Sequence, residues 1–365
     1  MYSPPERLLL GPGPSNVAPS VLQAMNSPLI GHLDPEFIKM MEEIKSMLRL
    51  VFRTENEMTF PVSGTGSAGM ETCFVNLVEP GDEVVIGVNG VFGMRMCDVA
   101  ERCGANVIKV EAEWGNIIEP AAIEASLKNR RPKLVAVVHA ETSTGALTPV
   151  EEISRITHEA GALLLLDTVT SLGGCPVSIA EWQVDAVYSG TQKCLSCPPG
   201  LAPVSFSPRA MEVISNRNSK VQSWYLDINF LANYWGSERV YHHTAPISMN
   251  YAIHEALRLV IDEGLETRWA RHQQAYEKLK DGLANLGLTI TSQEGHQIWQ
   301  LNAISVPTGA NEAKIRTQLL NEFGIEVGPG LGPLKGKIWR VGLMGHNATD
   351  ANVEHFLEAL SKCLA

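Results

Sequence analysis

The segments Ala162-Leu-Leu-Leu-Leu-Asp167 and Val184-Asp-Ala-Val-Tyr-Ser-Gly-Thr-Gln-Lys193 decide the fold of this chain. Each contains a short, nearly continuous apolar run, which is typical of a strand buried on both faces of a sheet. The runs expected to form strands are residues 84–88, 107–110, 134–138, 162–166, 184–188 and 201–206. Helix-like stretches separate them, so the pattern predicts an α/β fold with a mostly parallel sheet covered by helices on both faces.

Asp167 and Lys193 lie just past two of these runs. A lysine amine can form a Schiff base with pyridoxal 5′-phosphate (PLP), and a carboxylate can keep the pyridine nitrogen of that cofactor protonated. The pair therefore suggests PLP chemistry. The alternatives are an ordinary loop lysine and an aspartate that caps the following helix.

The composition limits the classes of protein and partner. The chain has 365 residues, of which 45% are hydrophobic, and this length and composition predict a globular protein with two domains. Its formal net charge is −11. It has no basic run that would favour nucleic acid, and no apolar stretch approaches the ~20 residues that span a bilayer. The N-terminal sequence does not resemble a secretory signal, and the seven scattered cysteines indicate reduced thiols. We therefore expect a cytoplasmic protein.

The C-terminal third of the sequence differs from this pattern. A long helical region over residues 250–285 is broken near Gly264. Beyond it, strand-like segments cover residues 298–306, 325–327 and 338–341, and helix-like segments cover residues 311–323 and 350–363. We predict an N-terminal arm (residues 1–15), a large PLP-binding domain (residues 16–264) and a smaller α+β domain (residues 265–365).

A glycine-rich loop, Ser63-Gly-Thr-Gly-Ser-Ala-Gly-Met-Glu71, precedes a predicted helix. Its backbone N–H groups could hold a phosphate at the helix N-terminus. The loop also matches the G-x-G-x-x-G pattern, which makes an NAD-dependent oxidoreductase the alternative from another class. That pattern requires an acidic residue at the end of the next strand, but Asp82 and Glu83 come before residues 84–88. A plain glycine turn that caps the helix is the third interpretation.

Two further patterns could indicate a metal or redox site. Cys194-Leu-Ser-Cys197 is a C-x-x-C, but a zinc site would need a second such pair and a redox site a thioredoxin-like context. His242 and His243 are adjacent, and adjacent side chains on a strand point to opposite faces. No third ligand stands at a useful spacing, so we expect no bound metal.

Eight stretches, in chain order, resemble the class V (fold type I) aminotransferases, and among them the alanine–glyoxylate and serine–glyoxylate (serine–pyruvate) aminotransferases. They are Leu8 to Asn16, Ser63 to Glu71, Asn89 to Gly93, His139 to Gly145, Leu166 to Gly174, Tyr188 to Lys193 with Pro198-Pro-Gly200, Tyr241 to Thr244, and Gly330 to Pro333 with Arg340-Val-Gly-Leu343. The resemblance covers nearly the whole chain. It implies a PLP-dependent transferase of fold type I, with a seven-stranded, mostly parallel sheet in the large domain.

The resemblance also implies roles for individual residues. Lys193 would form the Schiff base and then carry a proton between the substrate Cα and the cofactor, and Asp167 would pair with the pyridine nitrogen. Phe92 would stack on the pyridine ring, where many relatives have tryptophan. Thr142, or its neighbour Ser143, would hydrogen-bond to the cofactor O3′ or to the substrate.

Other residues would hold the phosphate of the cofactor. Gly66, Ser67 and Gln192 match phosphate-binding positions, with Ser67 where relatives often have histidine. Tyr241 and Thr244 match positions that reach the phosphate of the neighbouring subunit. The resemblance therefore implies a homodimer with shared active sites.

At the substrate end, Arg340 could bind an α-carboxylate through two guanidinium nitrogens, and the alternative is a structural salt bridge. The segment Leu10 to Gly13, which contains Gly11, would line the mouth of the pocket and leave room for a small side chain only. The resemblance thus implies transfer of the amino group of alanine or serine to glyoxylate, giving pyruvate or hydroxypyruvate and glycine.

Other activities within the same family are alternatives: serine–glyoxylate or ureidoglycine–glyoxylate aminotransferase, phosphoserine transaminase, and desulfurase. A desulfurase needs a catalytic cysteine in a mobile loop, and Pro198-Pro199 should stiffen the loop that carries Cys197. A relative without enzymatic activity should have lost Lys193 or Asp167, and this chain has both.

Overall fold

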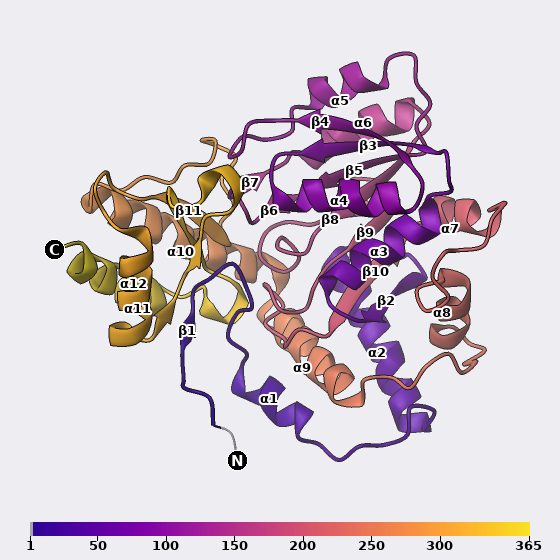
Figure 1. Cartoon of the computed structure of the whole chain (residues 1–365). Coiled ribbons are helices and arrows are strands. Elements are labelled where there is room, and N and C mark those ends of the chain that lie inside the picture. The colour runs from indigo at the N-terminus through magenta and orange to yellow at the C-terminus, as the bar shows by residue number, and fades with distance from the viewer. Residues whose placement is uncertain (1–2) are drawn as a thin grey trace.

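The computed structural model describes residues 3–365, and a seven-stranded sheet lies at its centre (Figure 1). Its strands are β2 (Met58–Ser63), β3 (Glu83–Val88), β4 (Asn106–Glu111), β5 (Leu134–Val138), β8 (Leu163–Asp167), β9 (Ala186–Tyr188) and β10 (Leu201–Phe206). Their order is β2-β10-β9-β8-β5-β3-β4. β10 is antiparallel to both of its neighbours, and the other adjacent pairs are parallel. The predicted α/β fold with a mostly parallel sheet is confirmed.

Helices cover both faces of this sheet. Along β5, Leu134, Ala136 and Val138 pack on one face, and Val135 and Val137 pack on the other. The first face is covered by α3 (Gly66–Leu77), α4 (Val91–Arg102), α7 (Pro208–Ser215) and α8 (Ile228–Trp235). The second face is covered mainly by α2 (Pro35–Phe52), α5 (Pro120–Leu127), α6 (Val150–Glu159) and α9 (Ile247–Glu263), with α1 (Pro19–Met25) packed on α9. Successive residues of β5 are all apolar because neither face of the sheet meets water.

The C-terminal part of the chain, residues 265–365, builds a separate hydrophobic core. Its elements are α10 (Leu265–Asn285), β11 (Leu301–Ser305), α11 (Glu312–Phe323), β13 (Gly328–Pro329), η1 (Gly332–Leu334), β14 (Ile338–Gly342), η2 (Gly345–Asn347) and α12 (Asp350–Leu364). The strands form an antiparallel sheet in the order β11-β14-β13. The domain boundary predicted between residues 264 and 265 stays a prediction; in the structure it coincides with the break between α9 and α10.

The N-terminal segment joins the C-terminal part rather than the large sheet. β1 (Leu8–Leu9) pairs in parallel with β12 (Ile325–Glu326), and Leu10 is buried in the C-terminal core. Figure 1 shows β1 beside the C-terminal elements. We call residues 7–15 the strap. Residues 1 and 2 of the predicted arm lie outside the described residues. Within residues 3–365, no helix is both long enough and apolar enough to cross a membrane.

Candidate active site

Neighbouring strands of the main sheet end at one edge, and a candidate residue follows each of them. Asp167 is the last residue of β8, while Phe92, Thr142 and Lys193 come shortly after β3, β5 and β9. These strands are parallel neighbours, so their carboxyl ends lie together, and that edge is where α/β proteins bind ligands. A hairpin of β6 (Ala140–Glu141) and β7 (Ala146–Leu147) carries Thr142 in its turn.

Asp167 is a buried carboxylate with two hydrogen bonds. Its Oδ1 accepts from the backbone N–H of Val169 at 2.8 Å, and its Oδ2 accepts from the hydroxyl of Tyr188 at 2.6 Å. Burial raises the pKa of Asp167 to about 6, and the Tyr188 hydrogen bond opposes that rise. Burial also raises the pKa of Tyr188 well above its usual range, so this hydroxyl remains a donor. A carboxylate in this setting can pair with a protonated ring nitrogen.

Lys193 is 8% exposed, and burial lowers the pKa of its amine to about 8. More of the amine is therefore uncharged near neutral pH than in a surface lysine, as a nucleophile requires. Its Nζ donates a hydrogen bond to the carbonyl of Pro12 in the strap. A Cβ on Gly13 would come within 2.6 Å of Lys193 Nζ, and Gly13 has a φ of +103°, so position 13 requires glycine.

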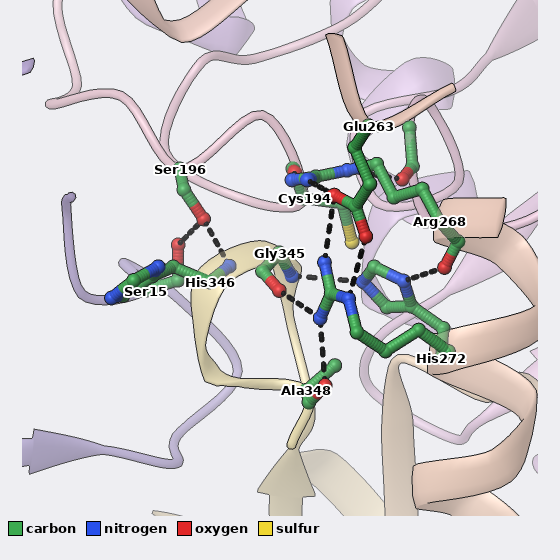
Figure 2. A network of polar contacts seen from close by, with 11 residues as sticks. Ser15, Cys194, Ser196, Glu263, Arg268, His272, Gly345, His346 and Ala348 are labelled. Carbon is green, nitrogen blue, oxygen red and sulfur yellow. Dashed lines mark hydrogen bonds and ion pairs between the residues drawn. The ribbon is translucent and has the colours of Figure 1, made fainter. Parts of the chain in front are cut away.

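The backbone of Lys193 is fastened from two sides. The hydroxyl of Ser15, at the end of the strap, donates to the Lys193 carbonyl at 2.8 Å, and the N–H of Ser196 donates to the same carbonyl at 3.0 Å. From the other side, the buried Arg268 of α10 donates to the carbonyl of Cys194 at 2.6 Å (Figure 2). The lysine is thus fixed both to the strap and to the C-terminal part.

Figure 2 shows the polar network behind this turn. Glu263 pairs with Arg268 at 2.6 Å, and the N–H of His346 donates to the Ser196 hydroxyl at 2.8 Å. The N–H of Gly345 donates to His272 Nε2 at 2.9 Å. Burial lowers the pKa of His272 to about 3, so its imidazole is neutral and can accept this bond. The network ties the Lys193 turn to α10 and to the η2 turn.

β14 carries Arg340 to the same edge of the main sheet. Its Nε donates to the carbonyl of Pro329 at 2.7 Å, and its Nη1 donates to the carbonyl of Thr142 at 3.2 Å. Burial lowers the pKa of Arg340 to about 10 and the nearby Glu141 opposes this, so the guanidinium is charged at neutral pH. None of the ion pairs within residues 3–365 involves Arg340, so a structural salt bridge is not its role here.

Ser143 and Thr142 differ in what they already bind. The Ser143 hydroxyl donates to Glu141 Oε1 at 2.6 Å and accepts from the N–H of Val91 at 3.0 Å. Glu141 Oε2 in turn accepts from the N–H of Phe92 at 3.1 Å, in the first turn of α4. The Thr142 hydroxyl forms no hydrogen bond within the described chain. Of the two candidates, Thr142 is therefore the one free to contact a ligand.

The glycine-rich loop opens α3, with Gly66 buried and Ser67 exposed. No side chain caps this helix, and the N–H of Ala68 donates to the carbonyl of Thr65 at 2.7 Å, so the N–H groups of Gly66 and Ser67 are available to an anion. A Cβ on Gly66 would lie 3.6 Å from the Cα of Gly190, and a Cβ on Gly190 would lie 2.8 Å from Gln192 Oε1. That amide oxygen is buried without a partner among the described residues. The three predicted phosphate positions therefore lie around one place.

A sequence model of the family described as aminotransferase class-V matches residues 7–356. The chain belongs to the class V aminotransferases. It is 39% identical over 378 residues to the (S)-ureidoglycine–glyoxylate transaminase of Bacillus subtilis strain 168, covering 99% of this chain and 91% of that one. It is 40% identical over 366 residues to the alanine–glyoxylate aminotransferase of Mus musculus, covering 99% and 88%. The crystal structure of the Nostoc sp. alanine–glyoxylate aminotransferase matches with a TM-score of 0.98 at 50% identity, covering 100% of this chain and 97% of that one.

This membership confirms the predicted aminotransferase and decides against the NAD-dependent oxidoreductase.

Tyr241 and Thr244 lie apart from the other candidate residues. They belong to the loop between α8 and α9 and are exposed, Tyr241 to 59%. The Tyr241 ring contacts His32, with 5.4 Å between ring centroids, and neither side chain hydrogen-bonds to Asp167 or Lys193. Their role toward a neighbouring subunit stays a prediction.

The predicted opposite orientation of His242 and His243 is wrong. The segment around them is not a strand, and their Nδ1 atoms lie 2.8 Å apart. The alternation of side chains holds only for extended backbone, which this loop lacks. Within residues 3–365, no group of three or more His, Cys, Asp or Glu side chains is arranged to hold a metal ion.

The cysteines near Lys193 are poor candidates for nucleophiles. Cys194 and Cys197 are buried free thiols, and burial raises the pKa of each to about 12. A desulfurase requires a reactive thiolate, which such burial suppresses. The desulfurase alternative therefore has no support at Cys197.

Three further residues contact the candidate residues and were not predicted from the sequence to belong to the site: Tyr188, Glu141 and Ser15. The signal for Tyr188 is a polar group in an apolar run, directly opposite Asp167 in the register of β8 and β9. Ser15 lies 178 residues from its partner Lys193. The pattern of apolar runs determines neither strand register nor contacts between residues so far apart in the sequence. The contacts of these three residues with the site could therefore be found only from the structure.

Proposed function

We propose that this chain is a PLP-dependent aminotransferase that transfers the amino group of alanine to glyoxylate, giving pyruvate and glycine. Serine is the second donor, with hydroxypyruvate as its product, and (S)-ureidoglycine is the third. The observation that carries the proposal is the meeting of Lys193, Asp167 and Arg340 at one edge of the main sheet. Glyoxylate appears in the names of the relatives from B. subtilis and M. musculus, which supports it as the acceptor here.

The residues at this edge fit PLP. Lys193 offers an amine whose pKa is lowered to about 8, and Asp167 offers a buried carboxylate. The uncapped first turn of α3 offers N–H groups to a phosphate. The unpartnered amide oxygen of Gln192 is an acceptor that a bound water could complete, whereas the amide NH2 of Gln192 is the group that would donate to the phosphate. Phe92 would give a flat apolar face to the pyridine ring.

When bound, PLP supplies the electron sink that makes the Cα–H of the substrate acidic. Asp167 holds the proton on the pyridine nitrogen, because an opposite charge close by favours the charged form of both groups. Arg340 binds the substrate α-carboxylate and orients the Cα–H toward the lysine. Lys193 Nζ then takes the proton from the substrate Cα, as a general base with a pKa near the operating pH.

The strap supports a preference for small substrates. The Pro12 carbonyl accepts a hydrogen bond from Lys193 Nζ, and Gly13 leaves no room for a Cβ beside that amine. A Cβ on Gly11 would lie 3.6 Å from Glu326 Oε1 and 3.8 Å from the N of Gly328, which is ordinary van der Waals contact, so the close approach is at Gly13. We place alanine first because its methyl group needs no polar partner under such a segment.

A homodimer with shared active sites is part of the proposal, with Tyr241 and Thr244 supplied by the partner. Exposed apolar residues include Leu29, Ile30, Leu33, Trp224, Tyr225, Phe230, Val240 and Tyr241. The ring of Trp224 stacks on His242 with 4.5 Å between ring centroids, and its centroid lies 6.0 Å from that of Phe230. The Tyr241 ring contacts His32, so several of these exposed apolar side chains belong to connected aromatic clusters. Gathered apolar surface of this kind marks protein–protein interfaces.

The seven free cysteines support a cytoplasmic location.

The test is a half-reaction with the purified, PLP-loaded protein. Alanine, serine and (S)-ureidoglycine are added separately, and the visible band of the lysine-bound cofactor is followed. We expect the fastest loss of this band with alanine and its return on addition of glyoxylate. If a donor removes the band but glyoxylate never restores it, the proposal that glyoxylate is the amino acceptor is wrong. Lys193→Ala should bind PLP yet lose turnover by orders of magnitude, and turnover at the wild-type rate would overturn the site.

A further inference from the structure

Glu141 is a fully buried carboxylate that the proposed chemistry does not use. Its Oε1 accepts from the N–H of Ser143 at 3.0 Å and from the Ser143 hydroxyl at 2.6 Å. Its Oε2 accepts from the N–H of Phe92 at 3.1 Å. Within the described chain no cation lies within ion-pair distance of it, so these hydrogen bonds, together with the nearby charge of Arg340, offset the cost of burying this group.

These bonds replace the missing cap of α4. Its N-cap residue, Gly90, has no side chain to accept the first N–H groups of the helix. The Ser143 hydroxyl takes the N–H of Val91, and Glu141 takes the N–H of Phe92 from 49 residues away in sequence. A carboxylate at this place also interacts favourably with the helix dipole. The position of Phe92 is therefore set by the hairpin of β6 and β7.

Gly90 is required by the closeness of this contact. A Cβ at position 90 would lie 2.3 Å from Ser143 Oγ and 2.4 Å from the carboxyl carbon of Glu141. Its φ of 177° is extended and open to any residue, so space rather than backbone conformation demands glycine. We call the fitted group of Gly90, Glu141 and Ser143 the capping contact.

The same turn also orients Arg340. Thr142 lies between Glu141 and Ser143, and its carbonyl accepts from Arg340 Nη1 at 3.2 Å. Residues 141–143 thus hold the helix that carries Phe92 on one side and the guanidinium of the C-terminal part on the other. A shift of this turn would displace both groups at once.

We propose that Glu141 is a positioning residue whose carboxylate fixes the ring-stacking Phe92 relative to Thr142 and Arg340. The proposal rests on the proposed function, because Phe92 and Arg340 have these roles only in a PLP-dependent aminotransferase. Glu141 acts through its neighbours and does not touch the reacting atoms.

Glu141→Gln tests this with little change in volume. An amide has one acceptor oxygen, so either Ser143 or Phe92 loses its partner and meets an N–H donor instead. The dissociation constant of PLP, measured by titration of the apoprotein, should rise at least several-fold and at most about 100-fold, because only the part of the cost of one unsatisfied buried donor that falls on the PLP-bound form weakens binding. At saturating PLP, the visible circular dichroism of the bound cofactor should also weaken, because its ring is held less firmly in one orientation.

Asp185→Asn is the control for the loss of a buried carboxylate away from the site. Asp185 accepts from the N–H of Leu164 at 2.9 Å and from the Ser207 hydroxyl at 3.0 Å, and it pairs with Arg209 at 3.1 Å, at the opposite edge of the sheet. Its loss should lower the melting temperature without changing the PLP dissociation constant or the dichroism. Glu141→Gln would overturn the proposal if it behaved in the same way, since its role would then be structural only.

Ser143→Ala keeps the proposal testable if Glu141→Gln fails to fold. It removes one hydroxyl of the capping contact, and a smaller change of PLP affinity and dichroism in the same direction is expected. Unchanged PLP affinity and dichroism in this variant would overturn the proposal. These readouts do not depend on turnover, so a wild type that fails the half-reaction would overturn the proposed function separately.

Discussion

At the scale of single residues, burial prepares Lys193 for chemistry at a cost to stability. Burial lowers the pKa of its amine from 10.5 to about 8. Below about pH 8 the amine carries its proton in both the folded and the unfolded state. Between these two pKa values the unfolded chain binds more protons than the folded one, so the free energy of unfolding rises with pH.

Lys193→Met should remove this pH dependence from the apoprotein. Between about pH 8 and pH 10.5, the free energy of unfolding of the wild type should gain up to about 3 kcal/mol relative to the variant. Urea unfolding on either side of this window measures the difference. Lys335→Met, at an exposed lysine, is the control; it keeps Lys193, so its free energy of unfolding should rise with pH as in the wild type. A difference between wild type and Lys193→Met that is constant with pH would contradict the prediction.

The sequence identifies Lys193 and Asp167 as candidates because each follows an apolar run, and the structure places both at the same edge. It leaves Thr142 and Ser143 undecided, because the choice depends on which hydroxyl reaches Glu141. That contact also involves Val91, which is 52 residues from Ser143. Local patterns carry no information about such an encounter, and only packing decides it.

At the scale of elements, the strap is held at both ends. Asn16 Oδ1 accepts from the N–H of Leu9 and from Asn347 Nδ2, each at 2.8 Å. Asn347 Nδ2 also donates to the Leu9 carbonyl at 2.8 Å. At its other end the strap holds Lys193 through Ser15. The strap is therefore a second link between the C-terminal part and the lysine, beside the hydrogen bond from Arg268 to Cys194.

Asn347→Ala should loosen the strap over the site. It removes the side-chain donor to the Leu9 carbonyl and leaves Asn16 Oδ1 with the N–H of Leu9 alone, which should cost about 1–3 kcal/mol of stability. Because the strap contacts Lys193 through Pro12 and Ser15, we also expect a several-fold rise in the KM for alanine. Asn311→Ala is the control, because it removes only the cap that accepts from Lys314 at 3.0 Å and should cost about 1 kcal/mol with KM unchanged. An unchanged KM in Asn347→Ala would show that the strap does not shape the pocket.

Apolar periodicity predicts the long elements well and their pairing poorly. The strand predicted at residues 84–88 lies within β3, and the strand predicted at residues 134–138 coincides with β5. Both were recognised because a fully buried strand has an unbroken apolar run. The strand predicted at residues 298–306 is shorter, from Leu301 to Ser305. The pairing of β1 with β12 was not predicted, because strands of two residues have no pattern of their own and form through contacts more than 300 residues apart.

At the scale of the whole molecule, the candidate site draws on both hydrophobic cores. Arg340 comes from the C-terminal sheet, while Asp167 and Lys193 come from the main sheet. Motion of the C-terminal part would therefore move Arg340, the carboxylate-binding group, relative to Lys193. The strap and the hydrogen bond from Arg268 limit this motion. The proposed dimer adds a further requirement, because Tyr241 and Thr244 can complete a site only across an interface.

Two defective variants should restore activity when they assemble together, if each site draws Tyr241 and Thr244 from the partner. In a mixed dimer of Lys193→Ala with the double variant Tyr241→Ala/Thr244→Ala, one site carries every defect and the other carries none. Co-expression with random pairing should therefore give about a quarter of the wild-type activity, measured at a PLP concentration that loads the double variant poorly. Sites contained within single protomers would give no more than the average of the two parent dimers. That result, or a monomer in sedimentation, would exclude the shared site and leave membership of the class V aminotransferases untouched.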